Sequence, residues 1–174
     1  MLGLLSRESI MKEYPLKKII RYNHRNRLQD ESVAEHTCFV SLFCLKIMAQ
    51  LKLTHEQERQ VLILAVLHDT CESITSDIPH DVKANYPEIQ GALEKVERDY
   101  YKQNWQKYFE DIYEPEEIVH NILKLADAYS VYQWCLNERM LGNKLACITE
   151  ICNDSAGRIR KYTENINKLI EKEN

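Results

Sequence analysis

At 174 residues the chain has the size of one ordinary domain, long enough to bury a core without disulfide bonds. Hydrophobic residues make up 44% and charged residues 29%, which excludes a disordered or a membrane-embedded chain. The net charge of -4 argues against a protein that grips a nucleic-acid polymer, because such proteins need a basic surface. With 4 Gly and 4 Pro few tight turns are available, so an all-α fold is expected.

The first half of the chain carries signals for three helices. One lies within residues 4–14 and is stopped by Pro15, because proline disfavours a helical conformation in the residue before it. The strings "SVAE" and "THEQ" each match a capping box, in which Ser or Thr is followed three residues later by Glu or Gln. These boxes predict two helices, over about 32–51 and 54–68.

Three further helices are expected in the second half. Pro87 starts a long charged helix that runs to about Trp105, and Pro115 starts another that is closed by Gly142, since proline is favoured at the first helical position. A last helix fills most of residues 143–172. No internal repeat, low-complexity segment or Gly/Ser/Pro-rich linker divides the chain, which predicts a single domain over residues 1–174.

The cysteines and the hydropathy pattern bear on the compartment. The six cysteines form no CxxC pair and mostly fall among apolar neighbours, as reduced buried thiols do. The start "MLGLLSRES" has too short an apolar run for a signal peptide, and no segment approaches the roughly 18 apolar residues of a membrane span. We therefore expect a cytoplasmic protein with no membrane partner.

Three polar residues share helix faces with apolar ones, because residues three, four and seven apart on a helix point the same way. His36 and His68 each lie on the apolar stripe of their predicted helix, and Asp127 lies on the apolar face of the helix after Pro115. A single inward His is more often a hydrogen-bonded core residue than a ligand. An inward Asp must be paired, protonated or bound to a cation, and an Arg or Lys from another helix could neutralise it.

If these helices meet, they bring a metal-binding set together. His36, His68, Asp69 and Asp127 would supply two imidazole nitrogens and two carboxylate oxygens, which suit Mn, Fe, Co, Ni or Zn better than Mg or Ca. Adjacent residues diverge by about 100° on a helix. His68 and Asp69 can therefore share one metal only if Asp69 lies at or past the helix end, and the polar sequence after it predicts that it does.

Three longer strings, "ESVAEHT", "LHDTCESITSDIPHDVK" and "KLADAYSVYQW", occur in an order that resembles the HD-domain superfamily of metal-dependent phosphohydrolases. They are most similar to its bacterial 5′-deoxynucleotidase (YfbR-like) branch. The similarity covers about residues 21–143, and the C-terminal helix, about 143–172, resembles the family only weakly. It implies an all-α, single-domain HD-domain helical bundle that holds one divalent transition metal per subunit on His36, His68, Asp69 and Asp127.

The resemblance also implies roles for residues around these ligands. Glu72, together with the ligand Asp69, would be catalytic, orienting a water or exchanging protons with it or with the leaving oxygen. Substrate binding would fall on an Arg and an aromatic upstream, on an Asp-hydrophobe-Pro turn that contacts the sugar, and on a phosphate-side Lys: Arg21, Tyr22, Asp77, Pro79 and Lys83. The family usually has Trp where this chain has Tyr22, so the family's preference for a particular base is the property that the resemblance implies least for this chain.

The activity implied is hydrolysis of the 5′-phosphate ester of deoxyribonucleoside monophosphates by a metal-activated water, in a protein that is a homo-oligomer, a dimer or higher. One alternative is a deoxynucleoside triphosphate triphosphohydrolase, which the extra basic residues His24, Arg25 and Arg27 would suit. A second is a non-catalytic HD-fold nucleotide-binding or sensor protein. A guanosine tetraphosphate hydrolase is disfavoured, because Ser73 stands where that group's motif wants Asp.

Overall fold

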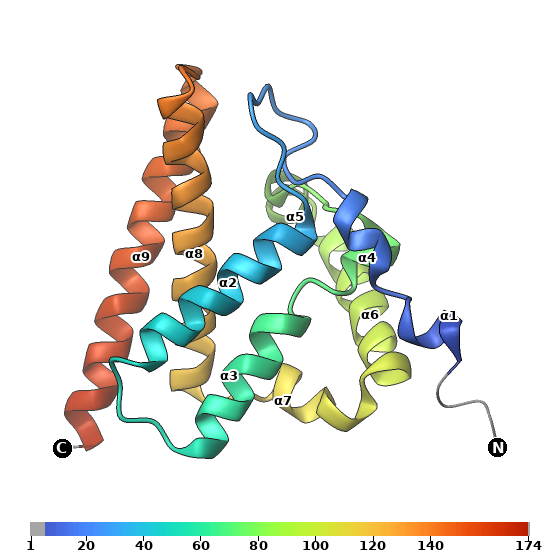
Figure 1. Cartoon of the computed structure of the whole chain (residues 1–174), viewed down its shortest axis with the longest axis vertical. Helices are drawn as coiled ribbons and strands as arrows, with labels where there is room; N and C mark the ends of the chain where they lie inside the picture. Colours follow the sequence, from blue (N-terminus) through green and yellow to red (C-terminus); the bar gives the residue numbers. More distant parts are fainter. Residues whose placement is uncertain (1–5, 174) are drawn as a thin grey trace.

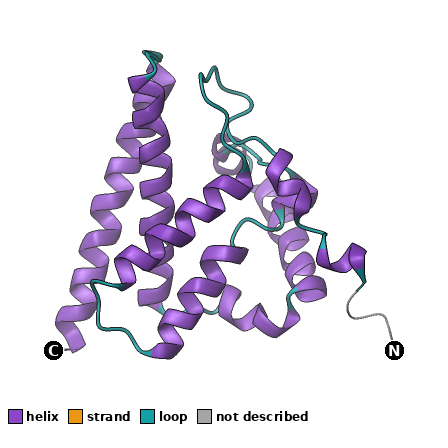
Figure 2. Ribbon diagram, in the orientation of Figure 1, coloured by secondary structure: helices purple, strands orange, loops and turns teal. Residues whose placement is uncertain are grey.

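The computed structural model describes residues 6–173 and contains helices, short helical turns and loops (Figures 1 and 2). Within this range there is no β-strand, and a lone antiparallel bridge joins Ile20 to Ser32. The elements are α1 (Arg7–Ile10), η1 (Tyr14–Lys18), α2 (Val33–Met48), α3 (His55–Leu67), α4 (Glu72–Thr75), α5 (His80–Asn85), α6 (Pro87–Asn104), η2 (Gln106–Tyr108), α7 (Phe109–Tyr113), α8 (Glu117–Met140) and α9 (Ala146–Glu173).

The two predicted capping boxes start α2 and α3. At α2 the Ser32 side chain accepts from the Glu35 amide and the Glu35 carboxylate accepts from the Ser32 amide. Thr54 and Gln57 make the same reciprocal pair at α3. Each box satisfies amide groups that the first turn of a helix leaves unpaired, so both predicted starts are confirmed.

The core lies where four of the helices pack together. Its buried residues include Val40 on α2, Leu64 on α3, Ile122 on α8 and Ile166 on α9. Figure 1 shows α8 and α9 running side by side in opposite directions, with α2 crossing them and α3 below it. The expectation of an all-α, single-domain bundle is confirmed, and no helix in residues 6–173 is both long and apolar enough to cross a bilayer.

Two parts of the chain differ from the predicted elements. The helix expected within residues 4–14 is shorter: α1 covers Arg7–Ile10, and residues 4 and 5 lie outside the described range. Pro15 does not end a helix but sits in the first turn of η1, where its missing amide hydrogen costs nothing. The short helices α4, α5 and α7 were not predicted, because one or two turns carry too few residues for a periodic pattern.

Candidate active site

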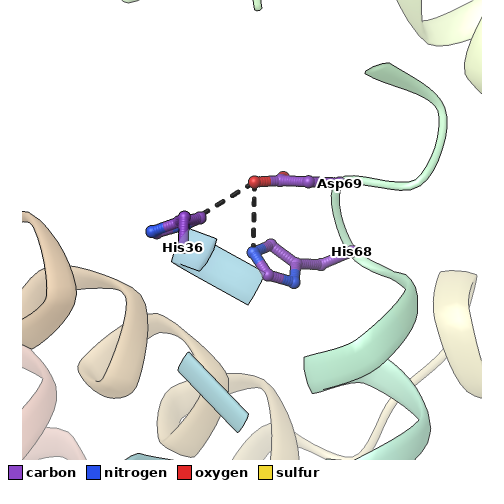
Figure 3. A group of neighbouring side chains, drawn as sticks. All are labelled: His36, His68 and Asp69. Carbon is purple, nitrogen blue, oxygen red and sulfur yellow. Dashed lines mark ion pairs between the residues drawn. The ribbon is translucent and has the colours of Figure 1, made fainter. Parts of the chain in front are cut away.

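Three helices bring the predicted metal ligands together. Asp69, which follows the last turn of α3, has its Oδ2 3.3 Å from His68 Nε2 and 3.5 Å from His36 Nε2, the contacts drawn in Figure 3. One ligand atom from each of these three residues lies within 4.8 Å of the other two. Asp127 of α8 lies at the edge of this group, with its Oδ1 3.3 Å from His36 Nε2.

The end of α3 allows adjacent residues to face one point. The helix ends at Leu67 and His68 is its C-cap, so Asp69 lies past the helix end, as the sequence predicted. The side chains of His68 and Asp69 therefore need not diverge by the 100° that separates adjacent residues within a helix. Tyr101 of α6, fully buried, brings its hydroxyl within 2.5 Å of the Leu67 carbonyl oxygen and 3.0 Å of that of His68. This contact holds the chain where it leaves the helix.

The protonation of His68 suits a metal ligand. Its Nδ1 lies 2.9 Å from the carbonyl oxygen of Ala65. A carbonyl only accepts hydrogen bonds, so Nδ1 carries a proton, and in the neutral ring Nε2 keeps a lone pair. Burial alone would lower the pKa of His68, but the nearby Asp69 carboxylate outweighs burial and raises that pKa. That Nε2 is buried and finds no hydrogen-bond partner among the described residues. A buried imidazole nitrogen left without a partner is costly unless something else binds it, so the site fits a cation.

His36 is held from behind by two residues. Its Nδ1 lies 3.0 Å from Ser130 Oγ and 2.7 Å from Arg21 Nη1, and its Nε2, like that of His68, has no hydrogen-bond partner among the described residues. Arg21 can only donate, so Nδ1 accepts in that contact; the tautomer in which Nδ1 instead donates to Ser130 is the one that leaves Nε2 free as a ligand. Burial and the positive charge of Arg21 lower the pKa of His36 to about 4, so its ring is neutral at physiological pH.

The environments of the carboxyl groups in the site shift their pKa values in opposite directions. Burial alone would raise the pKa of Asp69, but the contact with His68 holds it well below its usual range. Burial would also raise the pKa of Asp127. The contact with His36 and the charges of Arg158 and Arg21 outweigh this effect and hold that pKa well below its ordinary value. Burial, reinforced by the negative charges of Asp69 and Asp77, raises the pKa of Glu72 to about 9.

A cavity of about 410 Å³ opens over this cluster. Apart from His36, which is buried beneath it, every predicted site residue lines the cavity: Arg21, Tyr22, His68, Asp69, Glu72, Asp77, Pro79, Lys83 and Asp127. Lys124 of α8 and a wall of α9 that includes Ile151, Asp154 and Arg158 complete it. A cavity of this size is typical of small-molecule sites.

The predicted substrate residues are tied to one another. The Asp77 carboxylate accepts from the amide of Tyr22, which adopts a left-handed backbone conformation with φ 55°. The Tyr22 ring stacks on Trp134 with 4.3 Å between ring centroids. Arg21 uses Nη1 for the Glu31 carboxylate, at 2.9 Å, as well as for His36. Its other nitrogens make no hydrogen bond to a described residue, and Arg21 lines the cavity.

Several contacts of the site carry no sequence signal. Ser130, Tyr101 and Glu31 were not predicted, because each is an ordinary residue in its own segment and acquires a partner from elsewhere in the chain. Arg158 of α9 donates to Asp127 Oδ2 at 2.6 Å. The sequence left open that an Arg from another helix neutralises Asp127; this pair is present beside the contact of Asp127 with His36.

Solved structures of similar shape show the fold to be that of HD-domain proteins. An HD-domain phosphohydrolase from Listeria innocua has a TM-score of 0.73 and 21% identity, over 94% of this chain and 85% of its own. The HD phosphohydrolase DatZ of cyanophage S-2L, bound to dA and one catalytic Zn²⁺ ion, has a TM-score of 0.62 and 19% identity, over 90% of this chain and 95% of its own.

Sequence comparison assigns the family. A 5′-deoxynucleotidase from Photorhabdus temperata is 28% identical over 153 residues, which span 80% of this chain and 73% of the relative. The family model described as 5′-deoxynucleotidase YfbR-like matches residues 11–169. The chain therefore belongs to the YfbR-like 5′-deoxynucleotidase family. This confirms the predicted resemblance and the predicted class of enzyme, an HD-domain phosphohydrolase.

Proposed function

We propose that the protein hydrolyses the 5′-phosphate ester of deoxyribonucleoside monophosphates, releasing a deoxynucleoside and inorganic phosphate. The observation that carries the proposal is the convergence of two imidazole nitrogens that make no hydrogen bond to a described residue and two carboxylates beside a cavity bordered by Arg21 and Lys83. The family membership and the names of the relatives support the same substrate class.

We infer that His36, His68, Asp69 and Asp127 hold one divalent transition metal per subunit, one of Co, Mn, Zn, Ni or Fe. The chemistry of the donors supports this, since mixed nitrogen and oxygen sets suit these ions. The solved neighbour DatZ, which carries Zn²⁺, points the same way. When bound, such an ion supplies Lewis acidity, lowering the pKa of water and withdrawing charge from a phosphoryl oxygen.

The residues of the chain would divide the remaining work. In the reaction the oxygen of water bonds to phosphorus, the bond from phosphorus to the 5′ oxygen breaks, and that oxygen takes a proton. Glu72, catalytic together with Asp69, would exchange a proton with the water or the 5′ oxygen, and its raised pKa supports a role in proton transfer. Arg21 and Lys83 would bind phosphate oxygens.

The nucleoside would lie against the other predicted residues. Tyr22 offers an aromatic ring backed by Trp134, so a base or sugar could pack on it without disordering the ring. Asp77 and Pro79 would contact the deoxyribose. The hydrogen bond from the Tyr22 amide to the Asp77 carboxylate holds the aromatic side and the sugar side of the pocket in a fixed relative position.

One observation favours monophosphates over triphosphates. Two of the three basic residues that suggested a triphosphohydrolase are paired with acids: Arg25 with Asp81, and Arg27 with Asp30 at 2.7 Å. The third, His24, lines the cavity. Lys83 and Lys124 line the cavity and form no hydrogen bond or ion pair with a described residue. The positive charges of Lys83, Lys124 and Arg21 suit a single phosphate group better than the three linked phosphates of a triphosphate.

A nucleotide panel with product identification tests the proposal. Purified protein loaded with Mn²⁺, Co²⁺ or Zn²⁺ is incubated with deoxyribo- and ribonucleoside mono- and triphosphates, and the released species are separated by ion chromatography. Inorganic phosphate from deoxyribonucleoside monophosphates is expected. Tripolyphosphate from triphosphates would support the rival activity, and binding without release of any product would support the non-catalytic alternative.

We also propose a homo-oligomer, a dimer or higher, in the cytoplasm. Three large apolar side chains spaced three residues apart on α2 are exposed, Phe39 and Leu42 at 50% and Leu45 at 47%, and a second subunit would cover them. All six cysteines are free of disulfide bonds, which fits a reducing compartment.

A further inference from the structure

The C-terminal helix α9 forms one wall of the cavity, and the match to the family model extends along it to residue 169, further than the sequence resemblance predicted. Within this wall Arg158 contacts one of the predicted ligands: its Nη2 donates to Asp127 Oδ2 at 2.6 Å. The side chains of the pair are 33% and 18% exposed, so the contact lies mostly out of water, where a charge-assisted bond is stronger than at a free surface.

The contact divides the two oxygens of Asp127 between two helices. Oδ2 points to Arg158 on α9, and Oδ1 lies 3.3 Å from His36 Nε2 on α2. A carboxylate bound through one oxygen cannot turn about its side-chain bonds without breaking that bond. Arg158 therefore fixes which oxygen of Asp127 faces the cluster of His36, His68 and Asp69.

We propose that Arg158 is a positioning residue for the divalent cation: it holds Asp127 with a single oxygen directed at the metal-binding cluster, and so raises the affinity of the site. This rests on the proposed function, in which Asp127 is a ligand. Without Arg158 the Asp127 side chain is free to rotate. Cation binding must then restrict this rotation, and the entropy cost weakens the affinity. Residues that orient a metal ligand typically contribute 10- to 100-fold to affinity.

A simpler role is possible for such a pair, namely a salt bridge that only joins α8 to α9. The two roles differ in what they change. A purely structural pair alters the free energy of unfolding and leaves the dissociation constant of the cation unchanged in the folded protein. A positioning pair alters that dissociation constant, and a Lys, which keeps the charge but presents a single donor group, restores it in part.

The test is the dissociation constant for Mn²⁺, obtained from the electron paramagnetic resonance signal of the free ion, which requires no turnover. The variants are Arg158→Gln, Arg158→Met and Arg158→Lys in the full chain; Met keeps the apolar stem, so that packing against α8 survives. Arg160→Gln is the matched control, because Arg160 is an exposed Arg two residues away on the same helix. Asp127→Asn reports loss of the ligand itself.

We expect the dissociation constant to rise 10- to 100-fold in Arg158→Gln and Arg158→Met, to rise less in Arg158→Lys, and to stay within twofold of the original in Arg160→Gln. Unchanged Mn²⁺ affinity in folded Arg158→Gln and Arg158→Met, with Asp127→Asn weakened, would overturn the inference and leave the proposed function intact. Failure of the unsubstituted protein to bind one Mn²⁺ would instead count against the proposed metal site.

Discussion

At the scale of single residues, Asp69 and Glu72 lie only three positions apart in the chain, yet their carboxyl groups have very different pKa values. Asp69 faces two imidazole rings and remains ionised. Glu72 Oε2 is buried with no hydrogen-bond partner among the described residues, and the pKa of Glu72 rises to about 9. Pairs of acids whose environments push their pKa values apart are typical of acid–base sites.

This contrast predicts different outcomes for two substitutions. Asp69→Ala should abolish both cation binding and turnover, because it removes an oxygen from the cluster. Glu72→Ala should retain the cation but lose at least about 100-fold in turnover, the usual contribution of a general acid or base. Metal content after gel filtration and phosphate release measure the two effects. Equal loss of metal in both variants would show that Glu72 is a ligand.

At the scale of elements, the loop between η1 and α2 depends on one acid of α8. Glu138, at 0% exposure, accepts from the amides of Leu28 and Gln29 at 2.9 and 2.7 Å and from the Asn143 side chain at 2.7 Å. A carboxylate is tolerated in the interior when donors surround it in this way. Because Arg21 lies at the start of the same loop, Glu138 also steadies one edge of the cavity.

Glu138→Ala should therefore be strongly destabilising. It removes the acceptor of the Leu28 and Gln29 amides and of the Asn143 side chain, and we expect the free energy of unfolding to fall by about 3 kcal/mol. Urea denaturation followed by circular dichroism measures it. Glu164→Ala, at an exposed position on α9, serves as the control and should change stability by less than about 0.5 kcal/mol. Similar small effects in both variants would mean that the loop is held by other contacts.

At the scale of the whole molecule, the proposed metal would join α2, α3 and α8, so cation binding and folding should be coupled. A cation at 100 times its dissociation constant should stabilise the folded state by about 2.7 kcal/mol. Thermal unfolding with Mn²⁺ and with chelator measures the difference. His68→Ala should unfold at the same temperature in both conditions; a shift as large as in the unsubstituted protein would place the cation elsewhere.

The exposed apolar side chains of α2 give a second prediction at this scale. Leu42→Lys puts a charge in the centre of the surface formed by Phe39, Leu42 and Leu45, so it should shift the protein towards the monomer in sedimentation velocity. Leu62→Lys, at a 37% exposed position on α3, should leave assembly unchanged. If both variants sediment as the unsubstituted protein does, the subunits meet at another surface.

The chain order of the long helices was predictable because its signals are local. The capping boxes at Ser32 and Thr54 act within four residues, and Pro87 and Pro115 lie at or just before the starts of α6 and α8. The same local periodicity showed that His36, His68 and Asp127 face inward. The burial cost of such groups made a shared site a physical inference before any contact was known.

What only the tertiary structure decided is which distant side chains meet. Arg158 reaches Asp127 across 31 positions of the chain, Ser130 reaches His36 across 94, and Glu138 reaches Leu28 across 110. Each partner is an ordinary helical residue in its own segment. Their pairing follows from the angles at which α2, α8 and α9 pack, which depend on the whole core, so no short stretch of sequence carries it.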